Sequence, residues 1–350
     1  MSEDIRAHFR HQADASEQLG SRFTASLCRL LADELNRASE FGRRILDWSG
    51  DPRADALALR ACGALHALAR SGRLPELTAL YPPAPFDAEA MGRVLHEALD
   101  RHDAVLTDFL ESPPQTNEVA RSGLVLGAAL HTVARFGLPL ALYEIGASAA
   151  LNLAFDQYRY DLGDGRSWGR SDAVLTIPCA WRGTLPPLDP KVEVVSRAGC
   201  DRNPIDAGDP VQAERLLSYI WPDQTARFAR IEAALALAAS EGRRADRSDA
   251  ADWMERQLAA TPSPGTCRFV FHTIVWQYLP AATQARIADA LERAGEAATS
   301  DTPLVHFAVE NDNDPRGADA GARMTLRIWP GDEALELGRG DFHGRWADWA

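Results

Sequence analysis

The stretch LYEIGASAALNL, residues 142–153, contains residue types that suit a ligand-binding turn. An apolar run ends near Glu144, Gly146 follows, and Ser148 comes two residues later. Glycine lets a backbone turn sharply and approach a ligand closely, and an acid at the end of a strand can accept hydrogen bonds from a cofactor. The spacing therefore fits either a loop that cradles a nucleotide cofactor or a turn that lifts a nucleophilic serine above a sheet.

The serine interpretation reads Gly146, Ser148 and Ala150 as G-x-S-x-A, close to the G-x-S-x-G elbow of serine hydrolases. An acid at Asp312 or Asp314 and then His343 follow in the order of a catalytic triad. Against this, about 140 mostly helical residues precede the serine, and no oxyanion loop of the HGG type is found. We favour the cofactor loop, while the hydrolase elbow and a plain turn without a ligand stay open.

A second polar cluster, PPQTNEVARS (113–122), is unusual for a helical region. As a lid over the cofactor it would direct amide, carboxylate and guanidinium groups at a substrate. The substrate-binding candidates in it are Gln115, Asn117, Glu118 and Arg121. The alternative is an ordinary helix start, with Thr116 or Asn117 as the N-cap.

Acidic residues follow two further strand-like runs. Asp201 comes after KVEVVSRA (191–198) and can take the place of the acid that binds ribose hydroxyls, provided that an insertion lies within residues 161–190. Asp249 ends a short third strand, or else it caps the helix that follows. Asn152 belongs to the same cofactor-binding set because it lies in the stretch after Gly146.

The run FHTIVWQYLP (271–280) carries the residues best suited to catalysis. His272 can act as a general base near neutral pH, and Tyr278 follows at the end of the run as a second catalytic candidate. Trp276 can pack on a cationic or aromatic ligand, and His343 near the end of the chain can reach the substrate. The alternative for His272 is a histidine satisfied within the core.

The elements that must position these residues change in character near Gly137. Residues 1–137 show apolar positions at helical spacing and predict a helical cap domain that shapes the substrate pocket. Residues 138–350 alternate strands with helices, which predicts an α/β, Rossmann-like core: a doubly wound, mostly parallel sheet with a terminal antiparallel hairpin. The expected strands are 140–145, 173–181, 191–198, 267–276, 303–310, 323–330 and 333–340.

Composition limits the possible partners. The chain has 350 residues, is 46% hydrophobic and carries a net charge of −13, which argues against a nucleic-acid groove. No apolar run is long enough to cross a bilayer and the polar N-terminus lacks the apolar centre of a secretion signal, so we expect a cytoplasmic protein. The five scattered cysteines predict neither disulfides nor zinc, and no histidine–carboxylate spacing predicts another metal. The oligomeric state cannot be read from the sequence.

The order E-x-G-x-S-x-A at residues 144–150 resembles the first motif of S-adenosylmethionine-dependent methyltransferases, and the order of strands and helices is similar to their variant of the doubly wound fold. The resemblance implies that S-adenosylmethionine is the cofactor. It also implies the residues that would hold the cofactor: Glu144, Gly146, Ser148, Asn152, Asp201 and Asp249.

Seven stretches, taken together and in order, resemble an uncharacterised bacterial family catalogued as domain of unknown function 2332. They are residues 113–122, 144–153, 155–160, 199–206, 219–227, 271–280 and 341–349. The resemblance covers nearly the whole chain, supports the importance of these segments and supplies no reaction. The sequence departs from the expected family pattern at Ala150, where a glycine is expected.

These observations together lead to the hypothesis of a methyltransferase that acts on a small molecule of unknown identity. In it His272 deprotonates the substrate while the turn around Gly146 holds the cofactor. The alternatives are a serine hydrolase that uses Ser148, a non-catalytic nucleotide-binding protein, and a transferase that moves a group other than methyl.

Overall fold

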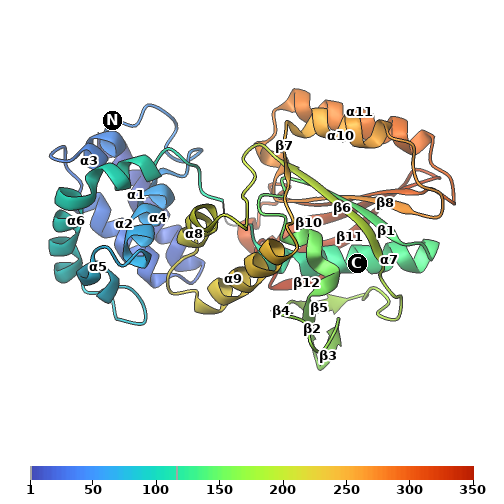
Figure 1. Ribbon diagram of the computed structural model, residues 1–350, viewed down its shortest axis with the longest axis horizontal. Helices are drawn as coiled ribbons and strands as arrows, with labels where there is room; N and C mark the ends of the chain where they lie inside the picture. Colours follow the sequence, from blue (N-terminus) through green and yellow to red (C-terminus); the bar gives the residue numbers. More distant parts are fainter. Residues whose placement is uncertain (1, 116) are drawn as a thin grey trace. The chain divides into compact units, whose positions relative to one another are not determined.

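The computed structural model describes residues 2–115 and 117–350. These residues form two compact units (Figure 1). The helical unit holds residues 2–115 and 210–229, and the sheet unit holds residues 117–209 and 230–350. Within the described residues, no helix is both long and apolar enough to cross a membrane.

The helical unit confirms the N-terminal helical region expected from the spacing of apolar residues. Side-chain caps fix several helix starts: the carboxylate of Asp87, for example, accepts from the Ala90 N–H at 3.0 Å. Phe9, Leu31, Phe41 and other apolar side chains are fully buried in its core. Its helices are α1 (Ser2–Gln18), α2 (Arg22–Glu34), α3 (Glu40–Leu46), α4 (Leu57–Arg70), α5 (Pro75–Ala79), α6 (Ala88–Phe109) and α8 (Pro210–Ser218), and α9 (Thr225–Ser240) begins in it.

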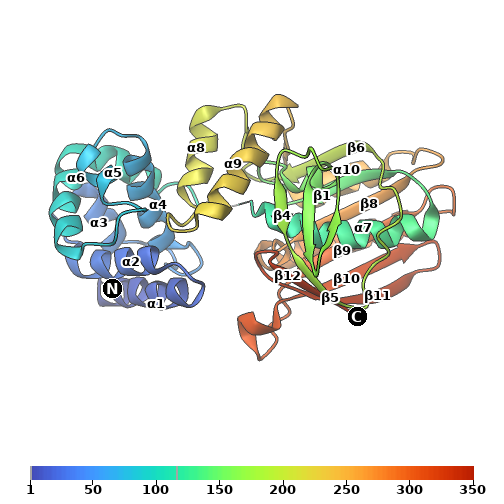
Figure 2. The same cartoon turned by 90° about the horizontal axis from the view of Figure 1, so that it is seen from below.

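The sheet unit is built on a large mixed sheet in the order β5-β12-β11-β10-β9-β8-β1-β6-β7. The five strands from β7 to β9 are parallel, whereas β9 to β12 are antiparallel and lie side by side (Figure 2). The strands are β1 (Leu140–Ile145), β5 (Ala180–Gly183), β6 (Val194–Asp201), β7 (Asp246–Arg247), β8 (Cys267–Thr273), β9 (Leu304–Glu310), β10 (Ala322–Trp329), β11 (Glu333–Gly340) and β12 (Trp346–Trp349).

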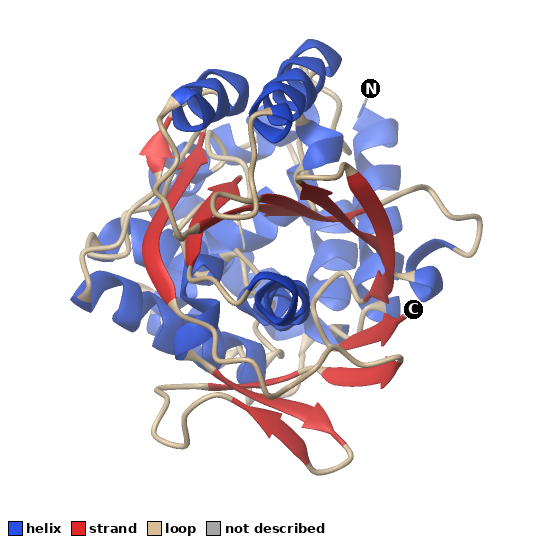
Figure 3. Ribbon diagram, turned by 90° about the vertical axis from the view of Figure 1, so that its right-hand side faces the viewer, coloured by secondary structure: helices blue, strands red, loops and turns tan. Residues whose placement is uncertain are grey.

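The sheet curves around one helix. Figure 3 shows α7 (Ser122–Phe136) end-on inside the arch of strands, and α10 (Ala250–Ala259) and α11 (Ala281–Glu296) outside it. Ile145, Val270 and Leu304 pack with residues of α10 and α11 on the outer face. A mixed α/β fold with a large, mostly parallel sheet is therefore confirmed; its antiparallel part runs from β9 to β12, and the edge strand β5 is parallel to β12.

The order of the parallel strands creates a switch point. The chain moves from β1 to β6 on one side, and it later returns to β8 on the other side of β1. In open α/β sheets, ligands bind outside the carboxyl ends of the strands at such a point. Here it lies between the ends of β1 and β8.

The connection from β1 to β6 contains no α-helix directly after the turn at Gly146, although strands were expected to alternate with helices. Ser148 and Ala150 have φ angles of +50° and +57°, and Ala154 is also non-helical, so no α-helix can form. A 3₁₀ segment, η2 (Asn152–Gln157), is followed by a small sheet in the order β3-β2-β4. Its strands are β2 (Arg159–Gly163), β3 (Arg166–Trp168) and β4 (Thr176–Pro178), and they fill the insertion that the spacing of Asp201 required.

Arg268, at the start of β8, is buried without a carboxylate partner among the described residues, only 5% exposed. Its guanidinium donates to Leu258 O at 3.3 Å and Ala294 O at 3.4 Å, near the C-terminal ends of α10 and α11. Each helix C-terminus carries roughly half a negative charge. Two such ends offset one guanidinium charge, so we assign Arg268 a structural role.

The five cysteines are all buried as free thiols. Among the described residues no cluster of three or more histidine, cysteine, aspartate or glutamate side chains could hold a metal ion.

Candidate functional site

Gly146 makes the turn that follows β1. Its φ angle is +72°, and the N–H groups of Gly146 and Ala147 both donate to Cys200 O at 2.9 Å. A Cβ atom at position 146 would lie 2.5 Å from Val275 Cγ2. The glycine is therefore required both by its backbone conformation and by the close approach of the segment after β8.

Asp201 ties this turn to the end of β6. Its carboxylate accepts from the Ser148 N–H at 3.0 Å and from the Asn203 N–H at 2.8 Å. The Ile205 N–H donates to Ser148 O at 3.1 Å. These bonds fix the loops after β1 and β6 against one another, so the acid expected to bind ribose also has a structural task.

A crevice of about 120 Å³ opens at the carboxyl ends of β1, β6 and β8. Two of the predicted cofactor residues, Gly146 and Asp201, line it, and so does Tyr278, whose side chain is 69% exposed. The full lining is Ile145, Gly146, Cys200, Asp201, Arg202, Ser248, Ala250, Val275, Tyr278 and Leu279. This crevice lies at the edge where the strand order predicts a ligand site.

The other predicted cofactor residues lie elsewhere. Glu144, Ser148 and Asn152 are buried, with 2%, 6% and 1% exposure, and do not line the described crevice. Asp249 is the N-cap of α10, where its carboxylate accepts from the Ala251 N–H at 2.9 Å and the Asp252 N–H at 3.3 Å. The helix-capping alternative therefore describes the contacts of Asp249.

Glu144, Ser148 and Asn152 are buried polar residues, and the side chains of Glu144 and Asn152 share a hydrogen bond. Burial raises the pKa of Glu144 well above its ordinary 4.5, although the hydrogen bond from Asn152 opposes this. Glu144 Oε2, Ser148 Oγ and Asn152 Oδ1 have no hydrogen-bond partner in the part of the chain that the structure describes. The buried carboxyl group therefore favours its protonated form.

His272 forms a dyad with Glu310, which is not among the residues predicted from the sequence. His272 Nδ1 lies 2.6 Å from Glu310 Oε1, which also accepts from the Val275 N–H at 3.0 Å. His272 Nε2 is buried and has no partner among the described residues. The Trp276 ring stacks on the imidazole, with ring centroids 5.0 Å apart and an interplanar angle of 15°.

The register places Glu144 and His272 on opposite faces of the sheet. In the β1–β8 ladder, Ile145 pairs with His272 and Glu144 pairs with Phe271. Paired residues of parallel strands point to the same face, and successive residues alternate. His272 thus lies on the outer face with Ile145, which also lines the crevice, and Glu144 lies on the face that carries α7.

Most of the predicted substrate-binding residues in the segment 113–122 form hydrogen bonds from their side chains to backbone groups. Asn117 Oδ1 accepts from the Leu151 N–H at 3.3 Å, and Glu118 caps a 3₁₀ turn, η1 (Val119–Arg121). Arg121 donates to Thr273 O at 3.0 Å and to Phe342 O at 2.8 Å, so this segment is brought together with the ends of β1 and β8. Gln115 follows α6 in the helical unit, and Thr116 lies outside the described residues.

The proposed triad partners of Ser148 have other contacts. Asp312 forms an ion pair with Arg339, and Asp314 forms one with Arg316. The His343 N–H donates to the Asp341 carboxylate at 2.9 Å. Because Ser148 Oγ has no hydrogen-bond partner in the described part of the chain, no imidazole is in place to activate it.

A family model described as "Uncharacterized protein conserved in bacteria (DUF2332)" matches residues 6–349. No curated protein and no solved structure matches the chain.

Proposed function

The chain belongs to the bacterial family DUF2332, and we propose that it is an S-adenosylmethionine-dependent methyltransferase that acts on a small molecule. The observation that carries this proposal is the crevice beyond β1, β6 and β8, at the switch point of the sheet.

The lining suits the adenosine part of the cofactor. The Asp201 carboxylate can accept hydrogen bonds from ribose hydroxyls, and Val275 and Leu279 offer apolar contact to a nucleobase. The exposed ring of Tyr278 can stack on the base. At about 120 Å³ the crevice is smaller than the roughly 300–1,000 Å³ typical of ligand pockets, so it would enclose only part of the cofactor.

The His272–Glu310 dyad supplies the base. A carboxylate only accepts, so Glu310 holds the proton on His272 Nδ1 and leaves the lone pair of Nε2 to accept a proton from the substrate. S-adenosylmethionine would supply the electrophilic methyl group. Because Nε2 is buried and Trp276 stacks on the ring, the segment η3 (Trp276–Tyr278) has to move before a substrate reaches the imidazole.

A non-catalytic nucleotide-binding protein is the second candidate. The burial of His272 Nε2 favours it, since a crevice can bind a ligand while the base stays covered. Binding without methyl transfer would support this candidate.

Calorimetric titration of the full chain with S-adenosylmethionine, S-adenosylhomocysteine and NAD tests the proposal. We expect saturable binding of the first two and at least tenfold weaker binding in Tyr278→Ala, because the stacking surface is removed. Val174→Ala, which also removes an exposed apolar side chain but lies outside the crevice, should bind normally. A chain that binds none of the three at millimolar concentration would refute the proposal.

Gly146 is a poor choice for this test. Any side chain at this position meets Val275 and adopts an unfavourable φ angle, so lost binding would not distinguish a ligand contact from damage to the turn.

A further inference from the structure

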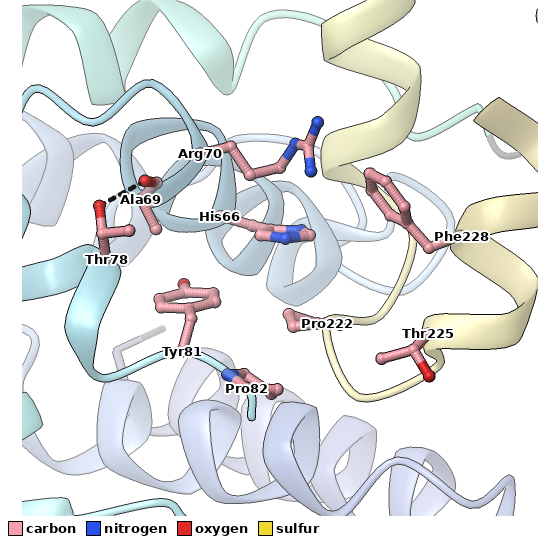
Figure 4. A pocket seen from close by; sticks show the side chains of 9 residues that line it. All are labelled: His66, Ala69, Arg70, Thr78, Tyr81, Pro82, Pro222, Thr225 and Phe228. Atoms are coloured by element: carbon pink, nitrogen blue, oxygen red, sulfur yellow. Dashed lines mark hydrogen bonds between the residues drawn. The ribbon is translucent and has the colours of Figure 1, made fainter. Parts of the chain in front are cut away.

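The helical unit contains a cavity of about 270 Å³ (Figure 4). It is surrounded by residues from α4, from α5 and the segment after it, and from the start of α9 and the loop before it. They are His66, Ala69, Arg70, Thr78, Tyr81, Pro82, Pro222, Thr225 and Phe228. The cavity is open to solvent on the side of Thr225, so a ligand could enter it without rearrangement of the core, and its size makes it a candidate ligand site.

Flat rings form much of the cavity wall. The rings of His66 and Tyr81 stack nearly parallel, with centroids 5.4 Å apart and an interplanar angle of 8°. In Figure 4 the Phe228 ring approaches the cavity from the other side, and the guanidinium of Arg70 lies 4.4 Å from its centroid. Aromatic faces of this kind favour stacking with another planar ring.

Three polar side chains of the wall have partners, whereas the buried hydroxyl of Tyr81 has no hydrogen-bond partner among the described residues. Arg70 forms an ion pair with Glu214, and the hydroxyl of Thr78 donates to Ala69 O at 2.6 Å. His66 Nδ1 lies 3.0 Å from Ser218 O, and burial lowers the pKa of His66 to about 4. The imidazole is thus neutral at pH 7, and the arginine charge is compensated, so the wall has no uncompensated charge to attract an anion.

We propose that this cavity is a binding site for a small, uncharged, planar aromatic molecule, with Phe228 and the His66–Tyr81 stack as its contacts. The volume, close to the lower end of the range of about 300–1,000 Å³ for ligand pockets, suits one or two fused rings. We do not expect a phosphorylated ligand, because Arg70, the arginine of the wall, is already paired with Glu214. The site is independent of the cofactor crevice, which belongs to the sheet unit.

Indole serves as the probe, titrated into the full chain in a calorimeter. We expect one saturable site, and binding at least tenfold weaker in Phe228→Ala, which removes one aromatic wall. Thr225→Trp places a large ring at an exposed lining position and should also block the site while leaving the core unchanged. The control Val105→Ala truncates an exposed apolar side chain on α6 outside the cavity, and it should bind indole like the unmodified chain.

Thermal melting of each variant separates loss of the site from loss of the fold, and Thr225→Trp decides the outcome if Phe228→Ala unfolds. No saturable heat with indole would overturn the proposal. Equal affinity in the unmodified chain and Thr225→Trp would overturn it as well. Saturation with S-adenosylhomocysteine should leave the affinity for indole unchanged, because the two ligands are expected to occupy different sites. The binding of indole and the binding of the cofactor are thus tested separately, and one proposal can fail without the other.

Discussion

Replacing Gly146 by alanine tests the geometry of the turn at the centre of the proposed site. An alanine Cβ would approach Val275 Cγ2 to 2.5 Å, and the residue would keep a φ angle near +72°. The left-handed conformation costs a non-glycine residue about 1–2 kcal/mol, and overpacking costs about 1–3 kcal/mol more. The sum of about 2–5 kcal/mol predicts a fall in melting temperature of about 4–20 °C for a domain of about 150–250 residues.

Gly137→Ala is the matched control. Gly137, also in the sheet unit, has a φ angle of +65°, and a Cβ there would meet nothing within 4 Å. It therefore carries the conformational cost alone. In the double variant Gly146→Ala/Val275→Ala the closest contact is removed, so part of the loss should be recovered.

Thermal melting of the full chain, followed by circular dichroism, measures all of these variants. If Gly146→Ala melted no lower than Gly137→Ala, the close approach of Val275 to the turn would be wrong. If the double variant recovered nothing, the clash would have a different partner.

Three further predictions concern the sheet unit. The His272 Nδ1–H should be visible in ¹⁵N-resolved NMR spectra because its hydrogen bond to Glu310 protects it from exchange with solvent. This protection should be lost in Glu310→Ala but not in the control Glu336→Ala. An imidazole signal that does not change in Glu310→Ala would contradict the dyad. Arg268→Met should lower the melting temperature, because the cation stabilises each of two helix C-termini by about 0.3–1 kcal/mol. Higher stability of the variant would instead show that the guanidinium is an uncompensated buried charge. The folded-state pKa of Glu144 is raised, so the contribution of this residue to stability is complete below its ordinary pKa near 4.5 and is lost as pH rises toward the folded-state value. Glu144→Gln should therefore raise the melting temperature more at pH 8 than at pH 5. A gain in melting temperature that does not depend on pH would contradict this assignment.

The sequence predicted the strongly patterned elements well. The strand expected at 140–145 is found as β1 with the same bounds, and the regular amphipathic spacing of residues 281–295 corresponds to α11 (Ala281–Glu296). Apolar runs between glycines and a regular amphipathic spacing are local signals, so these elements follow from neighbouring residues alone. The run 173–181, by contrast, is divided at Cys179 between β4 and β5, which belong to two different sheets.

The grouping of the site residues could not be read from the sequence. Glu144 and His272 both lie near the carboxyl ends of strands, and this suggested one site. Their separation onto two faces depends on the register of β1 against β8, where a shift of one residue reverses the face of every side chain. No local pattern carries that information.

Glu310 was not predicted as a site residue, although its position at the end of an expected strand was visible in the sequence. It is the last residue of the expected strand 303–310, and the carboxyl ends of parallel strands meet at one edge of a sheet. An acid at that position could have been paired with His272 once β8 and β9 were taken as neighbours.

In the proposed function, the crevice between the ends of β1, β6 and β8 holds an adenosine group. A crystal structure of the full chain soaked with S-adenosylhomocysteine tests it most directly. We expect the adenosine in the crevice, with its ribose at the Asp201 carboxylate and its base beside Tyr278. Density for the ligand at another place, or a crevice that stays empty at saturating ligand, would contradict it.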